Sequence, residues 1–215
     1  MLLRLIALFL QLWKAQLANH ILHNISGVHE FTATQPDTCS VTIFLSRMPA
    51  TELTLITRCV HPESAIEVRI IHIQKNSEKF TLTTQQHHDY PHTRSSVIVH
   101  GVLYDEAIFT YHGAILVGEQ APFTQAEQKS HTLLLSASAR AQATPSLQVL
   151  NKQVQAKHGS AIASVQPEQL AYCASRGISP IDAEKLLVES FLRSALDDAS
   201  MRELSASLAE ISSLS

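Results

Sequence analysis

The sequence predicts a mainly β body followed by a helical tail. β-Branched segments recur roughly every dozen residues up to Val165, each bounded by polar, glycine or proline positions. Few helical patterns lie between them, which excludes an alternating βαβ architecture and leaves a sandwich, a barrel or a β-solenoid. After Val165 the spacing of apolar residues changes from about two to about 3.6, which indicates helices.

Four segments carry the strand signal most clearly. They combine β-branched residues with partial alternation, and they run over residues 39–45, 65–73, 96–100 and 114–117. In residues 66–73 and 133–135 apolar residues also occupy successive positions, as in a coil packed between neighbours. No strict internal repeat is visible.

Two adjoining helices are expected after residue 165. Pro167 and Glu168 suit a first helical turn, and Gly177 is placed to end that helix as a left-handed cap. Ser179 then caps a second helix, in which Pro180 takes the first position and Asp182 completes a capping box.

The apolar residues of the tail define the faces of these helices. In the second helix they lie four apart, and a final amphipathic helix is expected near the end of the chain. The residues concerned are Ala183, Leu187, Phe191 and Ala195, and then Met201, Leu204, Leu208 and Ile211.

Composition narrows the function. Of 215 residues, 45% are hydrophobic and 16% charged, which is typical of a packed globular protein. The net charge of -3 argues against nucleic acid as a partner. Cys39, Cys59 and Cys173 are far apart and form no C-x-x-C pair, which favours a reducing compartment.

Phosphate-loop, dinucleotide, serine hydrolase and zinc protease motifs are absent from the sequence, so no bound nucleotide and no standard hydrolase activity is expected.

Residues 1–18 resemble the apolar part of a signal peptide. Arg4 interrupts the apolar run, the run is too short to span a bilayer, and Gln16 stands where a cleavage site needs a small residue. We therefore expect a buried strand or helix at one end of the fold, and no membrane association.

The stretch from Ser136 to Gly177 joins three unlike signals in order. Thr144-Pro145 precedes alternating strand positions, Lys157-His158-Gly159 follows, and a short helix closes on Ser-Arg-Gly. This order resembles the core of the SufB/SufD family, the β-helical subunits of the SUF iron-sulfur cluster assembly machine. The likeness extends back to Gly113 and on to Leu192, roughly the C-terminal half of the chain.

The resemblance implies a fold. Residues 1–165 are expected to form a right-handed parallel β-helix whose N-terminal part is shortened or diverged. Residues 166–215 are expected to form a small α-helical C-terminal domain.

Departures from the family pattern distinguish its two types. The SufB type has an acidic-His-Glu triplet where this chain has Lys157-His158-Gly159, and a cysteine one strand earlier. Residues 136–155 contain no cysteine. Tyr172-Cys173 is closer to the SufB pattern, but the missing thiol and carboxylate weigh more because those groups hold metal. The chain therefore resembles the SufD type.

The resemblance also implies a role. The chain would be a non-catalytic cytoplasmic scaffold subunit, with a SufB-type subunit and a SufC-type ATPase as partners and an iron-sulfur cluster held transiently by the complex. His158, with Lys157 and Gly159, would lie at the cluster-assembly interface, with His158 as a candidate metal ligand. The strands near residues 146–154 would join the partner's sheet, and the ATPase would dock at Arg176, Gly177, Leu187 and Phe191.

Read without the resemblance, His158 is more typical of a hydrogen-bonded structural residue at the end of a strand. Residues 85–92 group three histidines and a carboxylate, but their spacing matches no zinc pattern and we expect a polar loop facing water.

Two other function classes stay open. A carbohydrate-active or ligand-binding β-solenoid needs paired carboxylates on one sheet face, whereas Glu63, Glu67, Asp105 and Glu106 are scattered. A helix-turn-helix nucleic-acid module would span residues 175–187, but its second helix has an acidic face that opposes phosphate binding.

Overall fold

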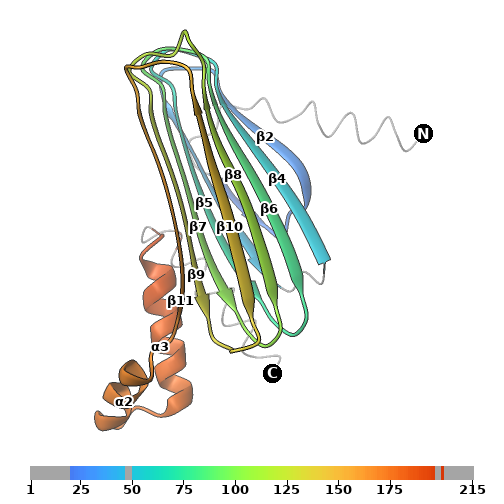
Figure 1. Ribbon diagram of the computed structural model, residues 1–215, viewed down its shortest axis with the longest axis vertical. Coiled ribbons are helices and arrows are strands. Elements are labelled where there is room, and N and C mark those ends of the chain that lie inside the picture. The colour runs from blue at the N-terminus through green and yellow to red at the C-terminus, as the bar shows by residue number, and fades with distance from the viewer. Residues whose placement is uncertain (1–19, 47–49, 197–199, 201–215) are drawn as a thin grey trace, which may run out of the picture.

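The chain forms a parallel β-solenoid followed by two helices, as the computed structural model of residues 20–46, 50–196 and 200 describes it (Figure 1). The strands are β1 His20–His23, β2 Gly27–Ala33, β3 Thr38–Ser46, β4 Ala50–Cys59, β5 Ala65–Gln74, β6 Lys79–His88, β7 Arg94–Leu103, β8 Ile108–Val117, β9 Gln125–Leu134, β10 Arg140–Val149 and β11 Gln155–Ser164. The helices are α2 Pro167–Ser175 and α3 Pro180–Arg193.

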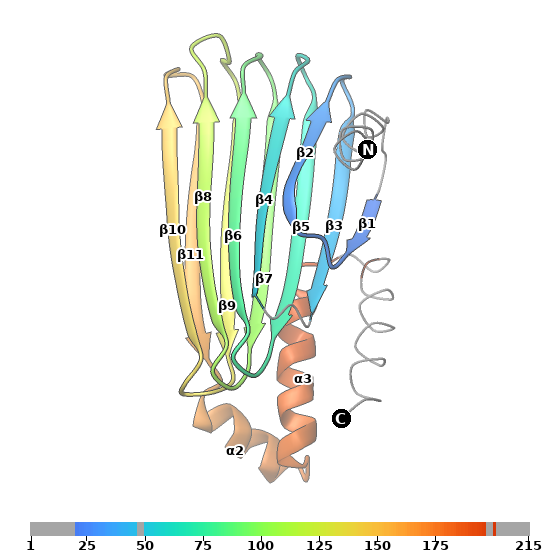
Figure 2. The same ribbon diagram turned by 90° about the vertical axis from the view of Figure 1, so that its right-hand side faces the viewer.

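The strands alternate between two sheets that face each other. Within the described residues the odd-numbered strands form one sheet in the order β1-β3-β5-β7-β9-β11, and the even-numbered strands form the other, β10-β8-β6-β4-β2. All neighbours pair in parallel, and Figure 2 shows the coils stacked from β1 at one end to β10 at the other. The solenoid is thus the correct choice among the three architectures that the strand pattern left open.

Period-two alternation builds the interior of each coil. In β5, Ile66, Val68 and Ile70 are buried between the sheets, while Glu67 and Arg69 face outward and form an ion pair at 3.0 Å. One continuous apolar core of such inward residues runs through the early coils.

The turns after the even-numbered strands contain a repeat that the sequence analysis missed. The pattern is any residue, Pro, any residue, Ser or Thr, and it recurs at residues 35–38, 61–64, 90–93 and 121–124. The residue after the proline has a positive φ in the last three of these turns. The backbone N–H of that residue donates to the next turn, from Glu63 to Pro91 at 3.3 Å and from His92 to Pro122 at 2.9 Å. The spacing varies from coil to coil, which hides the repeat from a search for strict periodicity.

Two local expectations about the strands are wrong. Residues 85–88 are the end of β6 and not a loop, and the His88 side chain is buried inside the solenoid. His158 and Gly159 lie in the middle of β11 and not at a strand end.

The expected start and stop residues of the two helices are confirmed, but Asp182 does not complete a capping box, because its carboxylate accepts from Ser179 Oγ at 2.6 Å. Gly177 follows α2 with a φ of 77°, a conformation that glycine adopts without steric cost. Ser179 Oγ accepts the backbone N–H of Asp182 at 3.2 Å and so caps α3.

Helix α3 packs on the outer face of the odd-numbered sheet. Ile71, Ile73 and Val102 point outward from β5 and β7 and are buried against Val188 and Leu192. The successive apolar residues of β5 are therefore explained by a covering helix as well as by neighbouring strands. The division into domains 1–165 and 166–215 stays a prediction.

Two expected elements fall outside the described residues: the apolar segment 1–18 and the final amphipathic helix from Met201. No helix in the described ranges is both long and apolar enough to cross a membrane.

Candidate functional site

The last coil of the solenoid, made of β10 and β11, is the candidate site. Among the described residues no strand pairs with the outer edge of either strand. Its inward positions are less covered than those of earlier coils, and Leu147 and Ile162 are 43% and 45% exposed. The coil therefore presents an open end with two adjacent sheet edges.

His158 lies at the centre of this end. It follows Gln128 of β9 in the inward-facing row of side chains, and it is exposed because no further coil covers it. Ser160 follows Ser130 in the same way. An exposed imidazole on an open edge is accessible to a group from another molecule.

Lys157 and Gly159 point to the outer face of β11. Lys157 is exposed and lies 3.5 Å from Glu127, which also pairs with Lys129 at 2.9 Å. The Lys129 hydrogen bond, aided by both lysine charges, lowers the pKa of Glu127. A Cβ added at Gly159 would meet nothing within 4 Å, so packing within this chain does not require glycine there.

The cysteines lie away from this end. Cys39 and Cys59 belong to the early coils, where burial raises the pKa of both thiols, that of Cys59 to about 12. Cys173 is buried in α2. A thiol with a raised pKa is a poor nucleophile and a poor metal ligand at neutral pH.

A buried polar network behind the open end was missed by sequence reasoning. Ser95 Oγ donates to Gln86 Oε1 at 2.6 Å, and Gln86 Nε2 donates to Gln128 Oε1 at 3.4 Å. His88 Nε2 lies 2.7 Å from Ser95 Oγ and completes the chain. Within the described part of the chain Gln128 Nε2 has no partner. The available signal was the appearance of Gln, Ser and His at inward positions of otherwise alternating strands.

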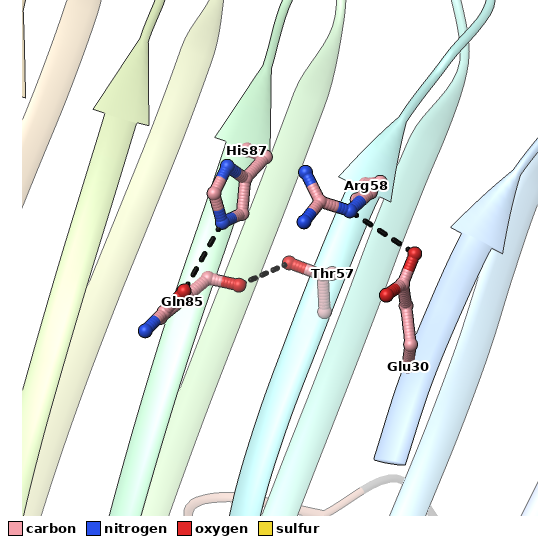
Figure 3. Close-up of polar contacts among 5 residues, drawn as sticks. All are labelled: Glu30, Thr57, Arg58, Gln85 and His87. Atoms are coloured by element: carbon pink, nitrogen blue, oxygen red, sulfur yellow. Dashed lines mark hydrogen bonds and ion pairs between the residues drawn. The ribbon is translucent and has the colours of Figure 1, made fainter. Parts of the chain in front are cut away.

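The histidines of residues 85–92 do not converge. His87 points outward beside Arg58, His88 points inward, and His92 stacks on Phe123 with ring centroids 4.9 Å apart. Figure 3 shows His87 donating from Nε2 to Gln85 Oε1 at 3.2 Å and Arg58 paired with Glu30 at 3.0 Å. No group of three or more His, Cys, Asp or Glu side chains in the described ranges is placed to hold a metal ion.

The proposed ATPase-docking residues divide into two sets. Arg176 and Gly177 lie in the exposed turn between the helices, with the Arg176 guanidinium over the Tyr172 ring at 5.4 Å. Phe191 instead packs against the sheet, with its ring centroid 4.8 Å from that of His100, and Leu187 is half-buried. The exposed apolar side chains of the helix pair are Leu170, Tyr172, Ile181 and Leu186.

Among the residues that the structure describes, neither rival function gains a site. Asp105 has a φ of 51° in the turn that also holds Glu106, so this carboxylate pair does not lie on a sheet face. Helix α3 buries Ala183, Val188 and Leu192, so one face of a would-be recognition helix is occupied.

The model of the SufBD core domain, of the SUF system for FeS cluster assembly, matches residues 37–191. The chain belongs to the SufB/SufD family. Like the fold, this agrees with the resemblance found in the sequence. The match includes both the open end and the two helices.

Individual relatives agree with this family assignment. The chain is 30% identical over 132 residues to the iron-sulfur cluster assembly protein SufD of Bacillus subtilis, covering 61% of this chain and 30% of that protein. It is 29% identical over 116 residues to an iron-sulfur cluster assembly SufBD family protein of Synechocystis, covering 54% and 26%. It is 28% identical over 148 residues to the chloroplastic protein ABCI7 of Arabidopsis thaliana, covering 66% and 30%. The chain thus spans less than a third of the length of these relatives.

Proposed function

We propose that this chain is a non-catalytic, SufD-like scaffold subunit that assembles iron-sulfur clusters together with a SufB-type subunit and a SufC-type ATPase. The observation that carries the proposal is the family match over residues 37–191, which contain both surfaces that such a role needs. One surface is the open end around His158, and the other is the exposed side of the helix pair.

At the open end, His158 would contribute one nitrogen ligand to a cluster carried as cargo. A neutral imidazole suits iron, and one histidine completes a site whose thiolates come from elsewhere. In the described part of this chain no group of three or more His, Cys, Asp or Glu side chains is placed to hold a metal ion, and the thiols of Cys39 and Cys59 lie in early coils. The remaining ligands would therefore come from the SufB-type partner.

The His158→Ala variant tests this role in a complex reconstituted with SufB-type and SufC-type proteins. Cluster yield per folded complex should fall, because a ligand is lost, while the melting temperature stays within about 2 °C, because the side chain is exposed. The control is His112→Ala, which removes an exposed imidazole from the outer face of β8. A lowered melting temperature with an unchanged yield would contradict the ligand role.

The ATPase would dock on the helix pair through the turn at Arg176 and Gly177 and the exposed apolar residues beside it. Replacing Ile181 and Leu186 by alanine should weaken ATPase retention in size exclusion without loss of stability, because both side chains are exposed. Leu187 and Phe191 stay proposed contacts. The comparison variant Phe191→Ala should weaken ATPase retention and also lower the melting temperature, because the Phe191 ring packs on His100.

Assembly itself is tested by co-expressing the chain with SufB-type and SufC-type proteins and purifying through a tag on this chain. Recovery of all three components supports the proposal, and recovery of this chain alone under conditions where the other two are soluble would refute it. The cytoplasmic location remains a prediction.

A further inference from the structure

Two histidines lie side by side on the outer face of the odd-numbered sheet, and α3 covers one of them. His100 of β7 and His131 of β9 are register partners on neighbouring parallel strands, and their ring centroids are 5.1 Å apart. His100 is only 4% exposed, because Phe191 and Ser194 pack over it, whereas His131 is half-buried. The pair therefore combines a buried imidazole with one that solvent reaches.

The hydrogen bonds of Ser194 fix the tautomer of His100. Ser194 Oγ donates its single hydrogen to Phe191 O at 2.6 Å. The same oxygen lies 3.3 Å from His100 Nε2, so it accepts there and Nε2 carries the ring hydrogen. In a neutral imidazole the other nitrogen then presents a lone pair, which here is His100 Nδ1.

This buried lone pair has no partner among the described residues. Buried polar atoms are normally paired, so an unpaired acceptor indicates a missing group. Imidazole nitrogens are ligands that zinc, nickel and iron accept. A tetrahedral ion about 2.1 Å from one nitrogen of each ring would place the two ring centroids about 5.2 Å apart. The observed 5.1 Å between His100 and His131 matches this separation.

The contact with Ser194 is also the kind of support that a metal ligand has. A histidine that binds metal through one ring nitrogen commonly donates its other N–H to an oxygen, which holds the ring and its tautomer in place. His100 already donates in this way from Nε2 to Ser194 Oγ.

We propose that His100 Nδ1 and His131 form a binding site for a divalent transition metal such as zinc, with Ser194 as the hydrogen-bond partner that orients His100. In the described ranges no group of three or more His, Cys, Asp or Glu side chains could hold a metal ion, so water would complete the coordination and the ion would exchange readily. The site goes beyond the proposed function, because neither histidine lies at the open end.

Metal binding at this place would strengthen the attachment of α3. A cation on Nδ1 polarises the ring, which makes the Nε2–H a stronger donor to Ser194 Oγ. Ser194 is the C-cap of α3, so a bound ion would reduce local opening of this helix end.

Titration of the purified full chain with cobalt(II) tests the two ligands. Cobalt replaces zinc, and its visible absorption reports four-coordinate geometry. His131→Gln removes one ligand and should weaken binding at the tightest four-coordinate site by at least about tenfold. His112→Gln is the control, because it removes an exposed imidazole from the outer face of β8, and it should leave that site unchanged.

A second variant tests the role of Ser194. Ser194→Ala keeps both imidazoles but removes the acceptor of the Nε2–H, and it should weaken cobalt binding by about tenfold. In wild type, saturating zinc should slow amide hydrogen exchange at residues 191–195, a readout that needs no substitution. In Ser194→Ala the same zinc concentration should leave this exchange unchanged. Circular dichroism checks that both variants fold.

Three results would overturn the proposal. One is equal cobalt affinity in wild type and His131→Gln, which is also the result if His131 donates its own N–H to His100 Nδ1. Another is cobalt binding without four-coordinate absorption bands. The third is unchanged exchange near the end of α3 when wild type is saturated with zinc. All of these measurements use the chain alone, so they stand or fall separately from co-purification with SufB-type and SufC-type proteins.

Discussion

The early coils and the last coil of this solenoid differ in what fills their interior. In β3, the inward residues Val41 and Ile43 have no exposed surface. In the last coil the corresponding rows hold His158 and Ser160 as well as Leu147 and Ile162, and all four are exposed. A coil is buried only when another coil covers it, so an open end lacks the burial that stabilises large apolar side chains.

Between these extremes the middle coils bury polar side chains. His72 Nδ1 donates to Gln74 Oε1 at 2.5 Å, since an amide oxygen only accepts, and the His72 ring packs 4.0 Å from that of Phe109. Buried polar groups cost free energy unless they are paired. The interior therefore becomes more polar toward the open end.

The largest expected difference between the two regions is their response to acid. Burial lowers the pKa of His72, His88 and His100 from 6.5 to about 4. In the unfolded chain these histidines bind protons below about pH 6.5, whereas in the native protein they stay neutral until about pH 4. The free energy of unfolding therefore falls as pH falls through this window. Between pH 6.5 and 5 the loss should be about 2 kcal/mol for each histidine.

Urea unfolding at pH 7, 6 and 5 measures how steeply the free energy of unfolding changes with pH, which is the slope compared below. In His88→Gln the slope should be smaller, because one of the buried histidines with a lowered pKa is removed. Equal slopes in wild type and His88→Gln would contradict the assignment.

The second difference concerns apolar burial. Leu55 in β4 is 1% exposed and Leu147 in β10 is 43% exposed. Leu55→Ala should cost about 2–5 kcal/mol of unfolding free energy because it leaves a cavity in a closed coil. Leu147→Ala should cost less than about 1 kcal/mol, since its side chain is only partly removed from water. Similar losses in the two variants by urea unfolding would show that the last coil is closed in solution.

The third prediction concerns a close approach within a middle coil. A Cβ added at Gly101 would lie 2.2 Å from the His72 ring, so Gly101→Ala should cost about 1–3 kcal/mol. Gly101→Ala should cost less unfolding free energy when it is added to His72→Ala than when it is made in wild type, because the obstructing ring is then gone. Thermal unfolding of both variants tests this coupling, and strictly additive losses would refute it.

The smallest expected effect on stability is at the open end. Lys157 is 73% exposed and its ion pair with Glu127 is 3.5 Å long. Lys157→Ala should therefore change the free energy of unfolding by no more than about 0.5 kcal/mol. Urea unfolding of this variant beside wild type measures the difference. A marked loss of stability would instead give Lys157 a structural role.

Local sequence rules determined much of the fold. Alternation located strands β3 and β5, and the cap residues at Gly177 and Ser179 set where α2 ends and α3 begins. These features depend on a few neighbouring residues, whose backbone preferences act before any tertiary contact forms. The ordered motifs around His158 also sufficed to indicate the family.

Tertiary structure decided the rest. The strand pattern left three architectures open, because alternation states which face of a strand is buried but not which strand lies next to it. Only stacking placed Gln128 under His158, set Gly101 against His72, and covered Ile71 with α3. These contacts join residues far apart in the chain, so no short segment contains both partners. Their stabilising energy arises only when the coils and the helix pack together.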